Sequence, residues 1–284
     1  MTPQTLRALP VGAAGSARHR RSAETAAAPA WARRLGLRLL SPLCILLIWE
    51  LASRAGLVSS TIIAAPSQIG STLWELLRSG ELAGHLLVSL GRSLSGLAIG
   101  ISAGVALALV AGLSRVGEIA VDAPMQMLRT LPSLALVPLF ILWLGVGEAM
   151  KIAMIAFGTA FPVYLTLFSG IRGVDAKLVE AGWTLGLSRL EQIRHVILPG
   201  ALPAFFVGLR FSLGLSWLIL VVVEQVNATS GIGFLANDAR DFARTDVIVI
   251  CLLIYCLLGL VIDMLVRGLE RVALAWRPSF IKEG

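Results

Sequence analysis

Long apolar runs recur along this chain at lengths that suit a lipid bilayer. A helix needs roughly 20 apolar residues to cross the hydrocarbon core. Only 14% of the residues are charged and 57% are hydrophobic, whereas soluble domains carry roughly 25% charged residues. We therefore expect an all-α, polytopic membrane protein. Its six transmembrane helices are predicted at about residues 35–53, 86–113, 125–145, 151–170, 203–223 and 247–266.

The basic residues between the runs indicate how the chain is oriented. The net charge is +7, but Lys and Arg separate apolar runs rather than gathering on one polar face, which argues against nucleic-acid binding. With the N-terminus in the cytoplasm, 17 of the 24 basic residues lie on the cytoplasmic side and five on the other. The positive-inside rule therefore favours two cytoplasmic termini. A flexible tail is expected over residues 1–34, a transmembrane domain over 35–270 and a second tail over 271–284.

The second predicted span carries a small residue at every fourth position, which forms one stripe along a helix. Such a stripe lets another helix backbone approach closely. It is either a static packing face or the moving seam of a pore, and both interpretations imply a helix bundle. The stripe consists of Gly96, Gly100, Gly104, Ala108 and Gly112.

Three prolines, Pro124, Pro132 and Pro138, fall in or beside the third predicted span. Each proline removes a backbone donor and disturbs a helical turn. At membrane depth, a break of this kind survives only beside protein or water. The span is therefore either a broken helix that lines a path or a kinked packing helix.

Between the fourth and fifth spans the sequence turns polar and carries helix-capping signals, over the segment DAKLVEAGWTLGLSRLEQIRHVILPG at 175–200. Asp175 suits an N-cap and Gly186 suits a left-handed C-cap. Between them, Leu178, Ala181 and Leu185 share one face. A short amphipathic helix is therefore predicted in the cytoplasm, ending at Gly186.

A second short helix is predicted directly after the first. Ser188 and Glu191 have the spacing of a capping box, and Pro199 is expected to follow the end of this helix. Acidic and basic residues nearly cancel in the segment, which disfavours a DNA-binding helix-turn-helix. A helix lying on the lipid surface is an alternative. We favour a rigid projection that a cytoplasmic partner binds, with an apolar stripe of Leu190, Ile193 and Ile197.

This segment resembles the motif E-A-A-x3-G-x9-I-x-L-P, which is typical of the membrane subunits of binding-protein-dependent ABC importers. Gly182 replaces the second alanine and Val196 replaces the isoleucine, while the spacing is unchanged. The matching residues are Glu180, Ala181, Gly182, Gly186, Val196, Leu198 and Pro199. The resemblance implies the type I importer permease fold, in which these residues couple the pore to ATP hydrolysis.

The resemblance extends from about Trp49 to Pro278. Within the family, segments such as VILPGALPAFFVGLRFSLGLSW and SGIGFLANDARDF are similar to the aliphatic sulfonate permeases. Nitrate, taurine and thiamine-precursor permeases are near relatives and remain alternatives. The resemblance implies a homodimeric pore in the inner membrane of a bacterium that carries a small anionic solute. It further implies two copies of an ATP-binding subunit, an extracytoplasmic solute-binding protein and surrounding lipid as partners.

The sequence gives no sign of an enzyme active site, a cofactor or a metal. It contains no G-x4-G-K-[ST] loop for ATP phosphates, so the energy is expected from a separate subunit. The three histidines fall in different predicted regions: His19 in the tail, His85 in an outer loop and His195 in the cytoplasmic segment. The cysteines all lie in apolar runs, where a thiol packs as a small hydrophobe; they are Cys44, Cys251 and Cys256.

Charged residues within spans are candidates for the pathway because burying them in lipid is costly. Arg210 either faces the path or pairs near the cytoplasmic surface. Glu224 precedes a glycine-rich turn, and Phe234 is a candidate plug of the outer mouth, in a loop that the resemblance suggests as a gate; a plain outer loop is the alternative. Arg92 is expected at the outer interface, and Glu50 is either a helix-end ion pair or a site.

Two other classes of protein were weighed against the importer subunit. A secondary transporter would show paired inverted halves and carboxylates at mid-membrane, and neither pattern is visible in the sequence. A structural scaffold would not require the capped helical pair of 175–200. The expected function is therefore that of a permease subunit without its own ATPase site.

Overall fold

The computed structural model describes residues 30–57, 59, 62–226 and 228–276, with side chains from residue 41 onward. The chain divides into two compact units, residues 1–48 and 49–284. Most of the helix α1 (Ala30–Arg54) belongs to the first unit. Its apolar side chains from 43 to 48 are largely exposed, which suits a helix that faces lipid. The helix already begins at Ala30, within the region predicted as a tail, and most of that tail lies outside the described residues.

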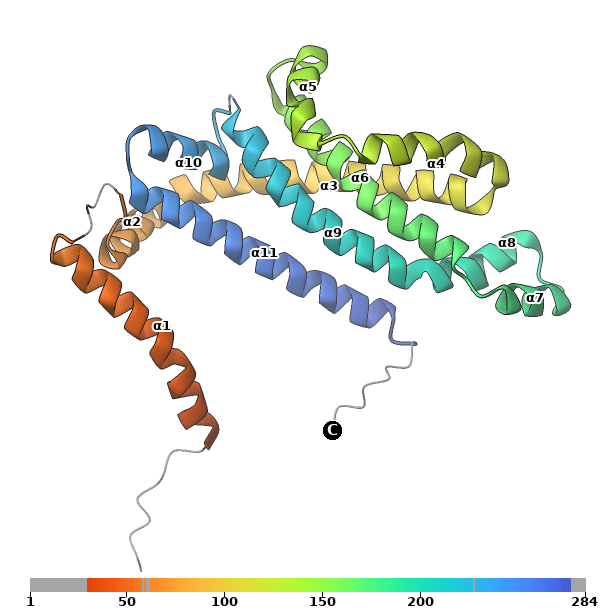
Figure 1. Ribbon diagram of the computed structural model, residues 1–284, viewed down its shortest axis with the longest axis horizontal. Helices are drawn as coiled ribbons and strands as arrows, with labels where there is room; N and C mark the ends of the chain where they lie inside the picture. The colour runs from red at the N-terminus through yellow and green to blue at the C-terminus, as the bar shows by residue number, and fades with distance from the viewer. Residues whose placement is uncertain (1–29, 58, 60–61, 227, 277–284) are drawn as a thin grey trace, which may run out of the picture. The chain divides into compact units, whose positions relative to one another are not determined.

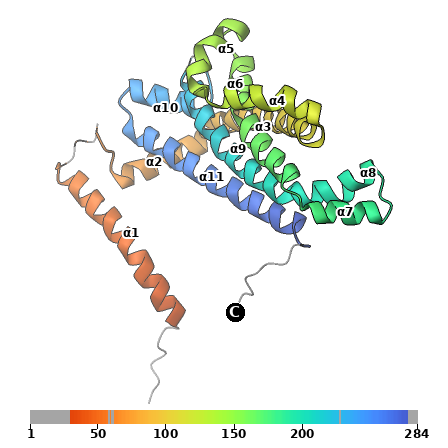
Figure 2. The same ribbon diagram turned by 45° about the vertical axis from the view of Figure 1, so that its right-hand side comes forward.

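The second unit is built on four long helices, and the described part of the chain contains no strand. The helices α3 (Glu81–Leu113), α6 (Glu148–Arg172) and α9 (Leu198–Gln225) pack side by side, and α11 (Thr245–Ala273) lies along α9 (Figures 1 and 2). Six of the leucines along α11 are more than half exposed, as expected for a helix against lipid. The all-α prediction is confirmed.

Four helices in the described residues are long and apolar enough to cross a membrane: α3, α6, the continuous stretch Arg189–Gln225 and α11. A fifth span results if one bent helix pair is counted as a single crossing. The first predicted span, 35–53, lies within α1, which is not among these helices. The count of six therefore stays a prediction.

The small-residue stripe of α3 packs against α6, as both a static packing face and a moving seam require. A Cβ atom added at Gly96 would lie 2.6 Å from Cβ of Ile155, and one at Gly104 would lie 2.6 Å from the carbonyl oxygen of Ala160. Both distances are shorter than two such atoms tolerate. Only glycine allows the two backbones to approach this closely.

The third predicted span, 125–145, is broken in the structure. The helix α4 (Arg115–Arg129) ends before Pro132, and a 3-10 turn (Ser133–Leu136) leads into the short helix α5 (Val137–Leu144). The two parts are bent by 91°. Proline explains the break, because it disfavours helical geometry in the residue before it and lacks a donor of its own. Of the two alternatives, a broken helix and a kinked helix, the structure shows the broken helix.

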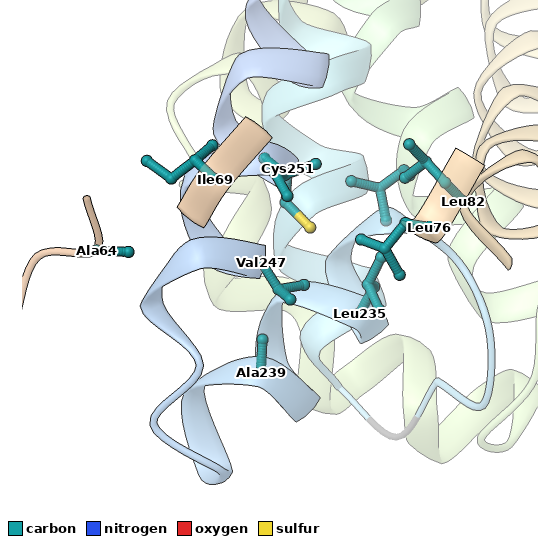
Figure 3. Close-up of a cluster of buried hydrophobic side chains, with 10 residues drawn as sticks. Ala64, Ile69, Leu76, Leu82, Leu235, Ala239, Val247 and Cys251 are labelled. Carbon is teal, nitrogen blue, oxygen red and sulfur yellow. The ribbon is translucent and has the colours of Figure 1, made fainter. Parts of the chain in front are cut away.

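An apolar core fills the end of the second unit that carries α10 (Ile232–Asp241), here called the α10 end. Helix α2 (Pro66–Ser79), the beginning of α3, α10 and the beginning of α11 meet there (Figure 3). Cys251 is fully buried in this core, whereas Cys44 and Cys256 are exposed, and all three are free thiols. The opposite end of α6 and α9 carries the helices α7 (Ala176–Thr184) and α8 (Arg189–Gln192) (Figure 1).

Candidate functional site

The first candidate site is the hairpin of α7 and α8, whose local geometry follows from its capping residues. The side chain of Asp175 accepts a hydrogen bond from the N–H of Lys177 at 2.9 Å, which caps α7. At the other end, Gly186 has φ +79° and its N–H donates to the carbonyl of Trp183 at 3.0 Å. The N–H of Leu187 donates to Gly182, which completes a Schellman motif. The predicted caps of α7 are confirmed.

The capping box at the start of α8 is also present. The backbone N–H of Ser188 donates to Oε2 of Glu191 at 2.8 Å, and the hydroxyl of Ser188 accepts from the N–H of Glu191. The buried Gln192 donates from Nε2 to the carbonyl of Val179 at 2.9 Å. This bond ties α8 to α7, so the two short helices form one rigid hairpin.

The expected stop before Pro199 is wrong. Helix α8 passes through a π-helical turn (Ile193–Ile197) straight into α9, and Pro199 stands in the first turn of α9. The N–H of Leu198 donates to the carbonyl of Ile193, five residues back. Pro199 has no N–H to donate to a preceding carbonyl. A π-helical turn before it allows the helix to continue despite this missing hydrogen bond. The hairpin is therefore mechanically continuous with a spanning helix.

The surface of the hairpin is apolar and open. The predicted stripe of α7 points away from the rest of the chain, since Leu178 is 58% exposed and Leu185 is 81% exposed. Leu190 is likewise exposed, so the hairpin has an apolar face without a partner among the described residues. Of the predicted coupling residues, Gly182 is buried and Pro199 is half-buried, whereas the others are exposed: Glu180, Ala181, Gly186 and Leu198.

The second candidate site is a buried ionic cluster at the α10 end. Arg92 of α3 is only 3% exposed. Its guanidinium donates from Nε and Nη2 to both carboxylate oxygens of Glu148, at 2.6 and 2.5 Å, and from Nη1 to Glu224 at 2.8 Å. Lys151 lies 3.5 Å from Glu148. The cluster joins α3, α6 and α9. Arg92, Lys151 and Glu224 are buried, where unpaired charges would be costly, whereas the side chain of Glu148 is 58% exposed.

The glycine-rich turn before α10 closes over this cluster. The carbonyl of Ser230 accepts from Nη1 of Arg92 at 2.6 Å, and the N–H of Gly233 donates to Glu224 at 2.8 Å. Gly231 has φ +113°, and a Cβ there would lie 2.6 Å from Nη1 of Arg92. The sequence SGIG is thus required by a tight turn around two charged side chains.

Two hydrogen-bonding residues of α3 complete the cluster. The hydroxyl of Ser89 donates to the carboxylate of Glu224 and accepts from the N–H of Ile232. Nδ1 of His85 accepts from the N–H of Gly231 at 3.0 Å. His85, predicted in an outer loop, instead lies in the first turns of α3. Arg92 is buried because it lies one helical turn before Gly96 on the packing stripe. Its predicted place at the outer membrane interface stays a prediction.

Of the predicted pathway residues, Glu224 and Phe234 lie together at the α10 end, and Arg210 lies apart from them. Arg210 lies far from the cluster and pairs with Glu270 of α11 at 2.7 Å and with Asp263. The ring of Phe234 lies 5.7 Å from the ring of His85, and Glu224 is part of the cluster. Glu50 pairs with Arg54 and accepts from the N–H of Ser67 at the start of α2. Across the described residues, no group of three side chains suits a metal ion.

Comparison with known sequences identifies the relatives of this chain. The family model described as binding-protein-dependent transport system inner membrane component matches residues 96–273. The chain is 48% identical to the putative aliphatic sulfonates transport permease protein SsuC of Escherichia coli (strain K12), over 84% of this chain and 91% of that protein. It is 45% identical to the SsuC protein of Bacillus subtilis (strain 168), over 85% of this chain and 88% of that protein.

More distant likenesses point in the same direction. The chain is 30% identical to the taurine transport system permease protein TauC of Escherichia coli (strain K12), over 86% of this chain and 90% of that protein. Among solved structures, an amino acid ABC transporter matches with a TM-score of 0.57 at 20% identity, covering 70% of this chain and 97% of that one. At this identity the structural likeness establishes the fold alone.

Proposed function

Because the chain belongs to the family of inner membrane components of binding-protein-dependent transport systems, we propose that it forms the membrane path for aliphatic sulfonates in an ABC importer. As a member of this family it is a permease subunit and carries no ATPase site of its own. The observation that supports the substrate is the identity of 48% and 45% to two SsuC permeases over most of both chains.

The physical chemistry of a sulfonate requires such a path. A sulfonate stays ionised at any physiological pH, and the idealised cost of moving an ion of this size into dry hydrocarbon is of order 20 kcal/mol. Inward movement of an anion against an inside-negative potential costs about 2.3 kcal/mol per 100 mV more. Import therefore needs both a polar route through the membrane and an external energy source.

The energy source is a pair of ATP-binding subunits that dock on the hairpin of α7 and α8. The open apolar face around Leu185 and Leu190 supports this docking, because apolar side chains exposed beyond the spans require a partner. The residues that carry the coupling are Glu180, Ala181, Gly182, Gly186, Leu198 and Pro199. A rigid hairpin that continues into α9 transmits movement of the ATP-binding subunits to the membrane.

The remaining partners are a second copy of this chain, an extracytoplasmic solute-binding protein and the lipid of a bacterial inner membrane. Both termini and the hairpin lie in the cytoplasm, and the α10 end lies outside. In this orientation Glu224 and Phe234 form an outer gate, held by the ionic cluster with Arg92. Arg210 lies near the middle of α9 and pairs with Glu270, which is close to the cytoplasmic end of α11.

A growth experiment tests the substrate. Deleting the gene for this chain should abolish growth on an alkanesulfonate as sole sulfur source and spare growth on sulfate, in a host without a second sulfonate uptake system. If sulfonate growth survives while taurine becomes unusable, the substrate is taurine, as the 30% identity to TauC allows. Loss of nitrate or thiamine-precursor use would point to those permeases, and uptake that follows an ion gradient without ATP would indicate a secondary transporter.

A biochemical experiment tests the energy source. The purified chain should hydrolyse no ATP, and hydrolysis should appear when its partner ATP-binding subunit is added. Hydrolysis by the isolated chain, after mass spectrometry has excluded a contaminating ATPase, would contradict the proposal.

A further inference from the structure

A cavity of about 440 Å³ opens between α6, α9 and the break that follows α4. This volume lies in the range of small-molecule sites. Its walls are mostly apolar and come from the middle of two spanning helices: Gly158, Phe161, Pro162 and Leu165 of α6 and Phe211 and Leu215 of α9. Three further residues, Arg129, Ser133 and Thr166, add polar groups to its lining.

The contacts of α4 with α6 show how far along the spanning helix α6 this cavity lies. Glu118 pairs with Arg172 at one end of α6, and the hydroxyl of Tyr164 donates to Asp122 at 2.9 Å. Helix α4 therefore runs along one half of α6 in the opposite direction. From Glu118 to Arg129 it rises by about 16 Å, which brings Arg129 level with Phe161 near the midpoint of α6.

A broken helix borders this cavity. At Pro132 the chain turns by 91° between α4 and the segment that contains α5 (Figure 1). Backbone groups freed by such a break persist at membrane depth only beside protein or a water-filled space. Broken spans form the solute sites of several transporter folds for this reason.

Arg129, which the count of basic residues places on the cytoplasmic side, instead lies level with the middle of α6 and has no counter-charge there. Arg129 is exposed, and no carboxylate among the described residues forms an ion pair with it. By contrast, Arg92 binds Glu148 and Glu224, and Arg210 binds Glu270. An ionisable residue inside a membrane that lacks a partner in its own chain marks a path for a charged solute.

We propose that this cavity binds the alkanesulfonate in transit, with the guanidinium of Arg129 on the sulfonate group and the apolar walls around the alkyl chain. This inference rests on the proposed function. The planar guanidinium matches the oxygens of an oxyanion, and each methylene that leaves water for the walls raises the affinity about fourfold. Sulfate and nitrate have no tail for these walls, and the ammonium group of taurine has no acidic partner there.

The test measures uptake by the complete transporter, reconstituted in liposomes with its ATP-binding subunits and binding protein. The probes are radiolabelled hexanesulfonate and ethanesulfonate. Arg129→Gln should raise the KM for both probes about 10- to 100-fold, the loss typical of a hydrogen bond to a charged group. The KM of Arg129→Lys should lie between those of the wild type and Arg129→Gln, because lysine keeps the charge but lacks the planar guanidinium. The control Arg115→Gln removes an exposed arginine at the other end of α4 and should leave the KM unchanged.

A second variant tests the cavity walls. Leu215→Trp fills part of the cavity, so it should raise the KM for hexanesulfonate at least tenfold and the KM for ethanesulfonate by less than threefold. Both variants are checked for assembly by co-purification with the ATP-binding subunits. If an Arg129 variant does not assemble, the chain-length shift of Leu215→Trp decides alone.

The outcomes separate the two proposals. If the wild type imports sulfonates but neither Arg129→Gln nor Leu215→Trp changes the KM, the binding site is wrong and the proposed function stands. Equal effects of Leu215→Trp on both probes would contradict the placement of the alkyl chain. If the wild type imports neither probe, the result contradicts the proposed function. It then also contradicts the proposal that the cavity binds a sulfonate.

Discussion

Arg92 of α3 and Glu224 of α9 form an ion pair of 2.8 Å in which the arginine side chain is 3% exposed and the carboxylate is fully buried. These residues are 132 positions apart in the sequence. The pair holds two spanning helices together at the α10 end and anchors the turn that precedes α10. Removing one partner of such a pair leaves the other charge buried without compensation.

Replacement of Glu224 by alanine should therefore lower the free energy of unfolding by about 3–5 kcal/mol. Glu224→Gln should cost less, because an amide still accepts a hydrogen bond from Ser89 or Arg92. Thermal unfolding of the purified protein in detergent measures both effects. The exposed pair of Arg240 and Asp241 provides a control, since Arg240→Ala should cost at most about 1 kcal/mol. Equal losses for Glu224→Ala and Arg240→Ala would show that the buried pair does not stabilise the fold.

Gly186 offers a test of the hairpin that depends on the backbone alone. Its φ of +79° disfavours a β-branched residue, although no neighbouring atom lies within 4 Å of a Cβ built there. Gly186→Val should leave membrane insertion intact and abolish transport by distorting the surface proposed to contact the ATP-binding subunit. Gly186→Asn is the matched control, because asparagine adopts the left-handed conformation more readily, and it should retain most of the uptake.

A charge reversal at Glu180 tests the same surface of the hairpin. Glu180→Lys leaves the hairpin caps untouched, since the exposed carboxylate of Glu180 takes no part in them. Uptake should nevertheless be lost while insertion is normal. Normal uptake by both Glu180→Lys and Gly186→Val would remove the coupling role from the hairpin.

The hairpin was predictable because its signals are local. Asp175, Gly186 and the capping box of Ser188 and Glu191 act on backbone groups two to five residues away, so their spacing in the sequence is the spacing in the structure. The expected stop at Pro199 failed because proline is tolerated in the first turn of a helix, and the sequence pattern does not distinguish a new helix from a continued one.

The ionic cluster was not predictable from local signals. Arg92, Glu148 and Glu224 meet only once three helices are packed, and their pairing depends on the rotation of each helix about its axis. One signal did exist, because Arg92 continues the stripe of Gly96 and Gly100 by one helical turn. A charged residue on a stripe that packs against another helix must be buried and must find a partner. The partners themselves required the structure.

The orientation of the chain is open to a direct labelling experiment. In a background without Cys44, Cys251 and Cys256, a cysteine at Thr229 should react with an impermeant thiol reagent added outside the cell. A cysteine at Leu185 should react only after the membrane is opened. Both positions are exposed, so access across the membrane decides the result. The reverse pattern would overturn the cytoplasmic placement of the hairpin.

Two glycines of α3 differ in what surrounds them, and this difference tests the contact between α3 and α6. A Cβ at Gly100 would lie 2.5 Å from the carbonyl oxygen of Ala156, whereas nothing lies within 4 Å of a Cβ at Gly91. Gly100→Ala should therefore force the helices apart and cost about 1–3 kcal/mol, the usual range for overpacking. Gly91→Ala should be neutral or stabilise by up to about 1 kcal/mol, since alanine favours the helix. Thermal unfolding of the two variants in the same detergent compares them. If Gly100→Ala is as stable as Gly91→Ala, the two helices are not in the close contact described here, and the stripe is a seam that opens rather than a packed face.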